Sequence, residues 1–384
     1  MLETSFPLQN IRPSYIREIL SAAKSPNMIS LAGGLPATEL IPMHLFSKAT
    51  LSISECSDLF QYGETRGYEP LINEAHKHYA ISNNISSMIT NGSQQGLDLI
   101  ARAFLNPGDN VALEAPSYLG ALQVLGLSQA RIHSVQQTNS GPDIHDLEAL
   151  FSSQKIKFFY AVPDFHNPTG VCWSLTTRQQ VAALCHLYGV TLIEDAPYRE
   201  LRFSGEPLPL VSSFCEDRAI VLRSFSKIAA PGIRLGMISA PQNVLAPMIK
   251  VKQASELHTA IPMQAILMKV LKDPEFTQHI DNVRTAYQTR YQALKQFLSR
   301  LHTYGCQISN IEGGMFVWLQ LPKIDPLTLA ESLLKQGVAV VPSNVFYHSD
   351  KNTPPALRLN FTHAKPDKLE AAVAKIERCL QQVI

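Results

Sequence analysis

Short apolar runs alternate with longer stretches of helical periodicity in the middle of the chain. The apolar runs predict buried strands at residues 88–90, 111–114, 157–162, 190–193, 219–222 and 236–239. Helix candidates, such as residues 177–188, lie between most of them. Strands that are apolar on both faces and separated by helices are typical of a mainly parallel sheet covered by helices. The pattern therefore predicts an α/β fold.

The pattern changes after about residue 270. Residues 276–301 predict one long helix, residues 313–319, 338–341 and 357–361 predict strands, and residues 366–383 predict a closing helix. This α+β order indicates a second, smaller domain. We expect a large domain over residues 46–275 and a small C-terminal domain over 276–384. Residues 1–45 are expected to form an arm and a helix that pack on the small domain.

Composition excludes several classes of protein. The 384 residues are 45% apolar and 17% charged, which allows a large buried core, and 33 basic against 32 acidic residues leave no basic field for nucleic acid. The N-terminus lacks a secretory pattern, and no apolar run approaches the ~18 residues of a membrane span. Six scattered cysteines without a Cys-x-x-Cys pair indicate reduced thiols in a cytoplasmic protein.

Polar residues follow five of the predicted strands. They are Ser93, Tyr118, Asn167, Asp195 and Lys227. Ligands of parallel α/β sheets bind beyond the carboxyl ends of the strands, so we expect these side chains to converge on one site.

Lys227 lies in the segment that runs from Ser224 to Gly236, between small hydroxyl residues and an arginine. A lysine that forms an imine needs a lowered pKa, from burial or from nearby positive charge. Arg234 could supply that charge and hold a phosphate together with Ser224 and Ser226. A solvated lysine at a strand end is the alternative. The whole segment favours an imine with pyridoxal phosphate (PLP), an aldehyde that carries a phosphate.

Asp195, Tyr198 and Asn167 are candidates for contacts to the ring of that cofactor. A carboxylate at a buried strand end needs a partner, and a protonated pyridine nitrogen is a suitable one. Tyr198 and Asn167 could donate hydrogen bonds to the phenolate oxygen of the ring. The alternatives are a cap or turn for Asp195, core packing for Tyr198, and ordinary Asn-Pro-x-Gly turn chemistry for Asn167.

Three further residues suggest ligand contacts. Ser93 opens a helix, where free N–H groups and the helix dipole bind phosphate, although it could be an N-cap alone. Tyr118 could stack on a pyridine ring or simply pack in the core. Arg358, within the apolar run 356–361, faces either solvent or an anion, and we interpret it as the holder of an amino acid's α-carboxylate.

Motifs for other chemistries are missing. The chain has no Gly-x-Gly-x-x-Gly, P-loop, Gly-x-Ser-x-Gly or His-Glu-x-x-His pattern. His76 and His78 point apart on a helix, so we interpret them as solvated and expect no metal site.

Taken in order along the chain, these pieces resemble the fold type I PLP enzymes, specifically the class I/II aminotransferases. The resemblance is strongest to the 2-aminoadipate, kynurenine and aromatic aminotransferase group, which includes the catalytic part of MocR-type regulators. It runs from about Ser14 to the C-terminus and is carried by residues 14–20, 31–36, 61–63, 90–97, 166–170, 194–198 and the Lys227 segment. It implies a mainly parallel sheet of the seven-stranded type in the large domain. Only about a dozen residues precede it, so no winged-helix domain is expected.

The resemblance implies roles toward the cofactor. Lys227 carries the imine and moves a proton, Asp195 pairs with the ring nitrogen, and Asn167 and Tyr198 contact the phenolate oxygen. Tyr118 stacks on the ring. The phosphate is held by Ser93, Gln94, Ser224, Ser226 and Arg234.

The resemblance also implies substrate and subunit contacts. Arg358 binds the substrate carboxylate, while Gly34 and Asn167 line the substrate site. Arg17 matches a position that contacts the substrate side chain in some 2-aminoadipate enzymes; a plain surface arginine is the alternative. Tyr62 reaches the phosphate of the partner subunit, which implies a homodimer with shared active sites.

The predicted function is PLP-dependent transamination by a ping-pong mechanism. The donor would be an aromatic, 2-aminoadipate-like or aliphatic L-amino acid, and the acceptor a 2-oxo acid, with 2-oxoglutarate expected by analogy. One alternative is a β-lyase or decarboxylase on the same scaffold, because the shared motifs bind PLP without choosing which bond breaks. Another is a PLP-binding module without catalysis.

Overall fold

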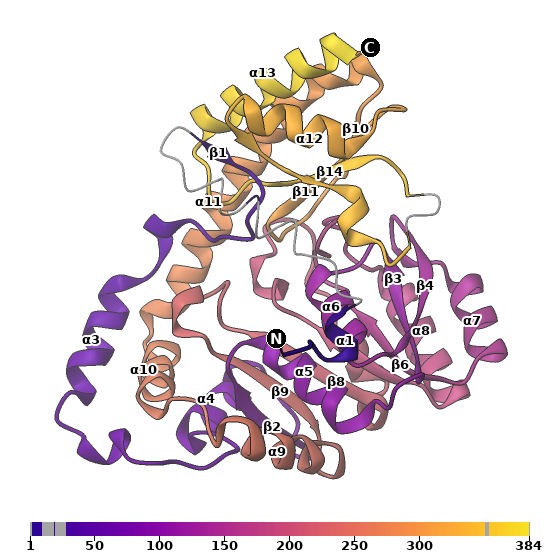
Figure 1. Cartoon of the computed structure of the whole chain (residues 1–384). Helices are drawn as coiled ribbons and strands as arrows, with labels where there is room; N and C mark the ends of the chain where they lie inside the picture. Colours follow the sequence, from indigo (N-terminus) through magenta and orange to yellow (C-terminus); the bar gives the residue numbers. More distant parts are fainter. Residues whose placement is uncertain (1, 10–18, 20–27, 350–352, 384) are drawn as a thin grey trace.

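The computed structural model describes residues 2–9, 19, 28–349 and 353–383. In the described residues the strands form a large sheet, a four-stranded sheet and a two-stranded pair. Figure 1 shows the large sheet in the lower part of the molecule and the four-stranded sheet above it, covered by the C-terminal helices.

The large sheet has eight strands in the order β2-β9-β8-β7-β6-β3-β4-β5. Their bounds are β2 Ile85–Thr90, β3 Asn110–Ala115, β4 Arg131–Thr138, β5 Gly141–Pro142, β6 Ile156–Ala161, β7 Thr191–Asp195, β8 Ala219–Ser224 and β9 Gly236–Pro241. Strands β8, β7, β6, β3 and β4 run parallel, while β9 is antiparallel to both of its neighbours. The predicted mainly parallel sheet is confirmed, with the two-residue β5 as an eighth, antiparallel strand.

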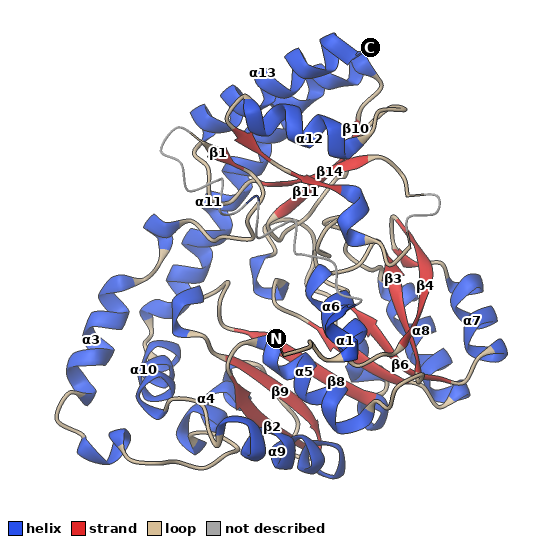
Figure 2. Cartoon of the chain, in the orientation of Figure 1, coloured by secondary structure: helices blue, strands red, loops and turns tan. Residues whose placement is uncertain are grey.

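Helices cover both faces of this sheet (Figure 2). The helices of this part of the chain are α3 Met43–Ile53, which lies against α10, and α4 Glu69–His78, α5 Ser93–Phe104, α6 Leu119–Leu127, α7 Ile144–Ser153, α8 Leu175–Tyr188, α9 Gln242–Glu256 and α10 Ile261–Lys272. Local chemistry sets the ends of α8, because the Ser174 hydroxyl accepts a hydrogen bond from the Thr177 amide and Gly189 closes the helix at φ 68°.

Alternate side chains along the strands of the large sheet pack in two separate hydrophobic cores, one on each face of the sheet. On β6, Phe158 and Tyr160 pack in the core that includes α5, whereas Phe159 packs in the core that includes α7 and α8. Successive side chains of a strand point to opposite faces, so both faces of β6 are apolar because both are covered.

The second sheet is antiparallel, in the order β10-β11-β14-β13. Its strands are β10 Gln307–Ile308, β11 Phe316–Gln320, β13 Val341–Pro342 and β14 Ala356–Asn360. A separate parallel pair joins β1 Ile29–Ser30 to β12 Val338–Ala339, so the N-terminal segment lies against the C-terminal part of the chain. The remaining helices are α1 Phe6–Gln9, α11 Glu275–Leu298, α12 Pro326–Lys335 and α13 Pro366–Val383.

The proposed domain boundaries near residues 45 and 275 remain predictions. Among the described helices, none is both long enough and apolar enough to cross a membrane.

Candidate active site

A cavity of about 450 Å³ lies beyond the carboxyl ends of the parallel strands. It brings together residues that follow five strands of the large sheet (β2, β3, β6, β7 and β8), a loop after β1, and one residue of β14. Of the residues predicted from sequence, it is lined by Gly34, Ser93, Gln94, Tyr118, Asn167, Asp195, Tyr198, Ser224, Ser226, Lys227, Arg234 and Arg358.

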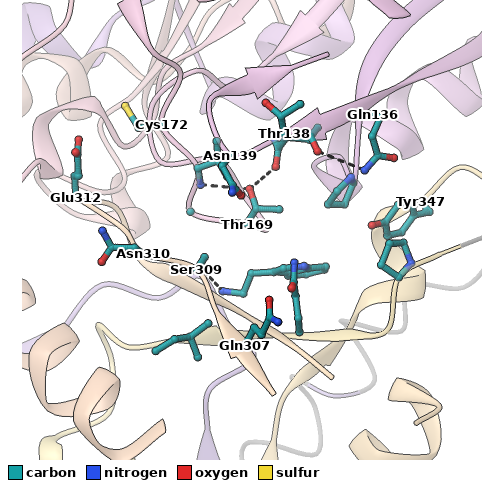
Figure 3. Close-up of a pocket in the computed structure, with 18 residues that line it drawn as sticks. Gln136, Thr138, Asn139, Thr169, Cys172, Gln307, Ser309, Asn310, Glu312 and Tyr347 are labelled. Atoms are coloured by element: carbon teal, nitrogen blue, oxygen red, sulfur yellow. Dashed lines mark hydrogen bonds between the residues drawn. The ribbon is translucent and has the colours of Figure 1, made fainter. Parts of the chain in front are cut away.

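A second cavity, of about 570 Å³, lies beside the loop that carries Asn167 (Figure 3). Amide and hydroxyl side chains such as Gln136, Thr138 and Ser309 line it. Its lining residues include no lysine, arginine or histidine, and the one carboxylate, Glu312, pairs with Arg202. This cavity therefore lacks the cations that a phosphate and a substrate carboxylate require, and the first cavity is the candidate site.

Arg358 is a buried cation on one wall of the first cavity, with 3% of its surface exposed. It lies at the centre of β14, between Trp318 of β11 and Val341 of β13. Its Nη1 donates to Asn167 Oδ1 at 2.8 Å and its Nη2 donates to the Ala32 carbonyl, while Nε has no partner in the described chain. Burial lowers the pKa of Arg358 to about 10.

No described carboxylate pairs with this guanidinium. Its Cζ instead lies 4.3 Å from the centroid of the Phe316 ring. A buried charge without a counter-ion is unfavourable, so the wall with Arg358 suits an anionic ligand.

Lys227 lies at the base of the cavity, three residues beyond the end of β8. Its Nζ donates to the carbonyl of Gly34 at 2.8 Å. Burial, together with the positive charges of Arg234 and Arg358, lowers the pKa of Lys227 to about 8. A substantial fraction of this amine is therefore neutral near pH 8, which is the form that attacks a carbonyl carbon.

Asp195 ends β7 and is buried at the cavity floor. Its Oδ2 accepts a hydrogen bond from the Tyr160 hydroxyl at 2.8 Å, while its Oδ1 has no partner in the described chain. Burial raises the pKa of Asp195 to about 7, and the hydrogen bond from Tyr160 opposes that rise. The free oxygen can accept a hydrogen bond from a cationic N–H of a ligand.

Asn167 and Tyr198 form an adjoining pair, with Asn167 Nδ2 donating to the Tyr198 hydroxyl at 3.4 Å. Both are buried. Burial raises the pKa of Tyr198 above its ordinary value, so its hydroxyl stays protonated and can donate to an anionic oxygen.

A second group of lining residues suits an anion. Helix α5 begins at Ser93, directly after Gly92, whose φ of 80° lies in the left-handed region. The positive φ favours glycine, and a Cβ at Gly92 would lie 2.7 Å from Nη2 of Arg234, which would then have to move. The buried hydroxyls of Ser224 and Ser226 border the same cavity. A helix N-terminus, hydroxyl groups and a guanidinium suit a phosphate.

Tyr118 lies on the cavity wall just before α6. Its hydroxyl donates to Gln94 Oε1 at 3.1 Å, and Gln94 Nε2 donates to the Gly120 carbonyl at 3.1 Å. These hydrogen bonds hold the Tyr118 side chain at the wall of the cavity, where its ring can stack on a planar ring of a ligand.

Two predicted residues are not among the lining residues. Tyr62 is 80% exposed and packs edge-on against His258, with ring centroids 5.8 Å apart. Its role in a partner's site stays a prediction. Arg17 lies outside the described residues.

Tyr160 is a lining residue that the sequence reasoning missed. It lies within the apolar run of β6 and was interpreted only as part of a strand. The available signal was its hydroxyl, since a buried tyrosine usually finds a hydrogen-bond partner.

The charges in the cavity match a ligand with two anionic ends and a cationic ring nitrogen. Three lining cations, Lys227, Arg234 and Arg358, face one carboxylate, Asp195. The unpartnered Oδ1 of Asp195 suits the protonated nitrogen of PLP, and the site around Gly92 suits its phosphate. The residues present therefore fit the cofactor that the sequence predicted.

Comparisons with known proteins agree with this chemistry. The family description "Aminotransferase class I and II" matches residues 26–376. The aromatic-amino-acid aminotransferase 1 of Thermococcus litoralis is 35% identical over 388 residues, covering 97% of this chain and 92% of the relative.

Two solved structures are similar over nearly the whole chain. The kynurenine aminotransferase of Pyrococcus horikoshii, in complex with PMP, has a TM-score of 0.95 at 34% identity and covers 99% of this chain and 97% of its own. LysN, the alpha-aminoadipate aminotransferase of Thermus thermophilus, in complex with N-(5'-phosphopyridoxyl)-L-leucine, has a TM-score of 0.92 at 32% identity, with the same coverage. This chain therefore belongs to the class I and II aminotransferase family.

Proposed function

We propose that the protein is a PLP-dependent aminotransferase that moves the amino group of an L-amino acid to a 2-oxo acid. The observation that carries this proposal is Arg358, a buried guanidinium with no described carboxylate partner, in the same cavity as Lys227. It offers a site for the α-carboxylate of an amino acid next to an amine with a lowered pKa.

The residues of the cavity would hold the cofactor at three points. Ser93, Ser224, Ser226 and Arg234 would bind the phosphate, and Oδ1 of Asp195 would accept the N–H of the ring. Asn167 and Tyr198 would donate to the ring oxygen, with Tyr118 against the ring face. When bound, PLP supplies an aldehyde that condenses with amines and a protonated ring that accepts the electron pair released at the substrate carbon.

Lys227 would carry the proton transfers. Its Nζ has a pKa lowered to about 8, so near pH 8 a substantial fraction of the amine is neutral and can accept the α-proton of the substrate and return it. The Gly34 carbonyl, which accepts from Nζ at 2.8 Å, holds this amine beside the residues expected to line the substrate site.

The names of the similar proteins suggest the donors to test first. They include aromatic-amino-acid, kynurenine and alpha-aminoadipate aminotransferases. We therefore propose aromatic or 2-aminoadipate-like donors, with aliphatic donors as a further class, and 2-oxoglutarate as acceptor. A panel of L-amino acids with 2-oxoglutarate, scored by the glutamate formed, should give turnover with at least one of these classes.

The same panel separates transamination from a lyase or decarboxylase. Incubation of the PLP-loaded enzyme with donor alone should convert the cofactor to pyridoxamine phosphate and release one 2-oxo acid per site. If no donor produces pyridoxamine phosphate while ammonia or CO₂ is released, the lyase or decarboxylase alternative replaces the proposal. A cofactor that binds without any turnover would favour the non-catalytic module.

Replacement of Arg358 by alanine should raise KM for every amino acid substrate by about 10²-fold, since one charged hydrogen-bonded partner of a buried pair is removed. Steady-state kinetics over the donor panel measures this. Arg300→Ala, which removes a surface arginine that pairs with Glu370 at 3.8 Å, is the matched control and should leave KM unchanged. A rise confined to one side-chain class would instead make Arg358 a specificity residue.

We also propose a homodimer with shared active sites. In this arrangement the exposed Tyr62 would contact the phosphate in the partner subunit. Light scattering should then give twice the 42.5 kDa mass of one chain. A cytoplasmic location is proposed from the six cysteines, which are all free thiols; fractionation of the cells that make the protein tests it.

A further inference from the structure

Tyr160 lies on β6 and lines the candidate active site, with 2% of its surface exposed. Strand β6 pairs in parallel with β7, where Tyr160 lies opposite Ile193, two residues before Asp195. The tyrosine ring therefore points to the same face of the sheet as Asp195 and extends toward the strand end. Its hydroxyl donates to Asp195 Oδ2 at 2.8 Å.

The carboxyl group of Asp195 has its two oxygens in different surroundings. Within the described part of the chain, Oδ2 accepts from Tyr160 and Oδ1 has no donor. The backbone gives no further support, because the next amide, that of Ala196, donates to the Leu222 carbonyl. Rotation about the last torsion of an aspartate is otherwise soft, so this one hydrogen bond decides which oxygen faces the cavity.

The direction of the hydrogen bond is also determined. Burial and the negative charge of Asp195 raise the pKa of Tyr160 well above its ordinary value, so the hydroxyl keeps its proton and donates it to the carboxylate, which can only accept. A donor favours the ionised carboxyl, in opposition to burial, which raises the pKa of Asp195 to about 7.

We propose that Tyr160 is a positioning residue for Asp195: its hydroxyl keeps the carboxylate ionised and turns Oδ1 toward the ring nitrogen of the cofactor. The inference rests on the proposed function, because the ring nitrogen belongs to PLP. Tyr160 does not touch the reacting atoms and acts through Asp195 alone. Its loss should therefore matter only for a ligand that has a nitrogen at that ring position.

The test compares two ligands on the apoenzyme. Pyridoxamine 5′-phosphate cannot form an imine with Lys227, so its affinity reports the non-covalent contacts. The second ligand is its analogue with a CH group in place of the ring nitrogen. Tyr160→Phe should weaken pyridoxamine phosphate about ten-fold, as expected for the loss of a hydrogen bond to a charged group, and should leave the analogue unchanged. Fluorescence titration measures both dissociation constants.

Tyr291→Phe is the matched control. Tyr291 is equally buried and its hydroxyl donates to Asn310 Oδ1 at 3.2 Å, but it does not line the candidate active site. It should leave both affinities unchanged. Urea unfolding of the two variants checks that each retains its fold; phenylalanine keeps the ring that packs in the core at position 160.

The affinities of Tyr160→Phe for the two ligands either support or contradict the role proposed for Tyr160. Equal weakening of both ligands would make Tyr160 a general structural residue and overturn the inference, and so would unchanged binding of both. The proposed function fails separately, since it is contradicted if the wild-type apoenzyme binds neither pyridoxamine phosphate nor PLP.

Discussion

Lys227→Ala should abolish amino transfer almost completely, with a loss on the order of 10⁴-fold. The variant lacks the amine whose pKa is lowered to about 8 by burial, Arg234 and Arg358, and no other lysine lines the cavity among the described residues. Glutamate formation from the best donor measures the loss. The visible absorbance that PLP acquires on bonding to a lysine amine should disappear as well.

Two further variants sharpen this experiment. Lys227→Arg keeps a positive charge at the cavity floor but cannot bond to an aldehyde or take a proton near neutral pH, so it should be as inactive as the alanine variant. Lys155→Ala changes an exposed lysine and should behave as the wild type. Near wild-type turnover of Lys227→Ala would falsify the mechanism proposed for this lysine.

Asp195→Asn should slow the reaction by about 10²-fold or more while the fold and phosphate contacts persist, because one charge of a buried pair is lost. Asparagine keeps an oxygen that can accept the Tyr160 hydrogen bond, so the side chain remains in place. It cannot carry the negative charge that holds a proton on the ring nitrogen. Single-turnover kinetics with an α-deuterated donor should show an enlarged isotope effect, because removal of the α-proton becomes slower.

Asp109→Asn is the control for this charge change. Asp109 forms a partly exposed ion pair with Lys157 at 2.8 Å, outside the cavity, and its loss should cost little. An unchanged rate in Asp195→Asn would remove the role assigned to Asp195 and, with it, that of Tyr160.

The sequence alone was sufficient for the parts of the fold that depend on local pattern. The apolar runs located β6, β7 and β8 to within two residues, and the predicted helix 366–383 coincides with α13. Strand β4 was missed because its sequence, Arg131–Thr138, has only two apolar residues, Ile132 and Val135, and so carries little apolar signal. The reversed direction of β9 was also not predicted, since an apolar strand reads the same whichever way it runs.

For the site, sequence determined which residue types follow the strands, because parallel strands bring their carboxyl ends to one edge of the sheet. Only the tertiary structure decided how the side chains pair. Arg358 donates to Asn167, which is 191 positions away. Tyr160 lies in an apolar strand, yet its hydroxyl donates a hydrogen bond to Asp195. Local sequence patterns report burial and direction, whereas the partner of a buried polar atom depends on packing between distant segments.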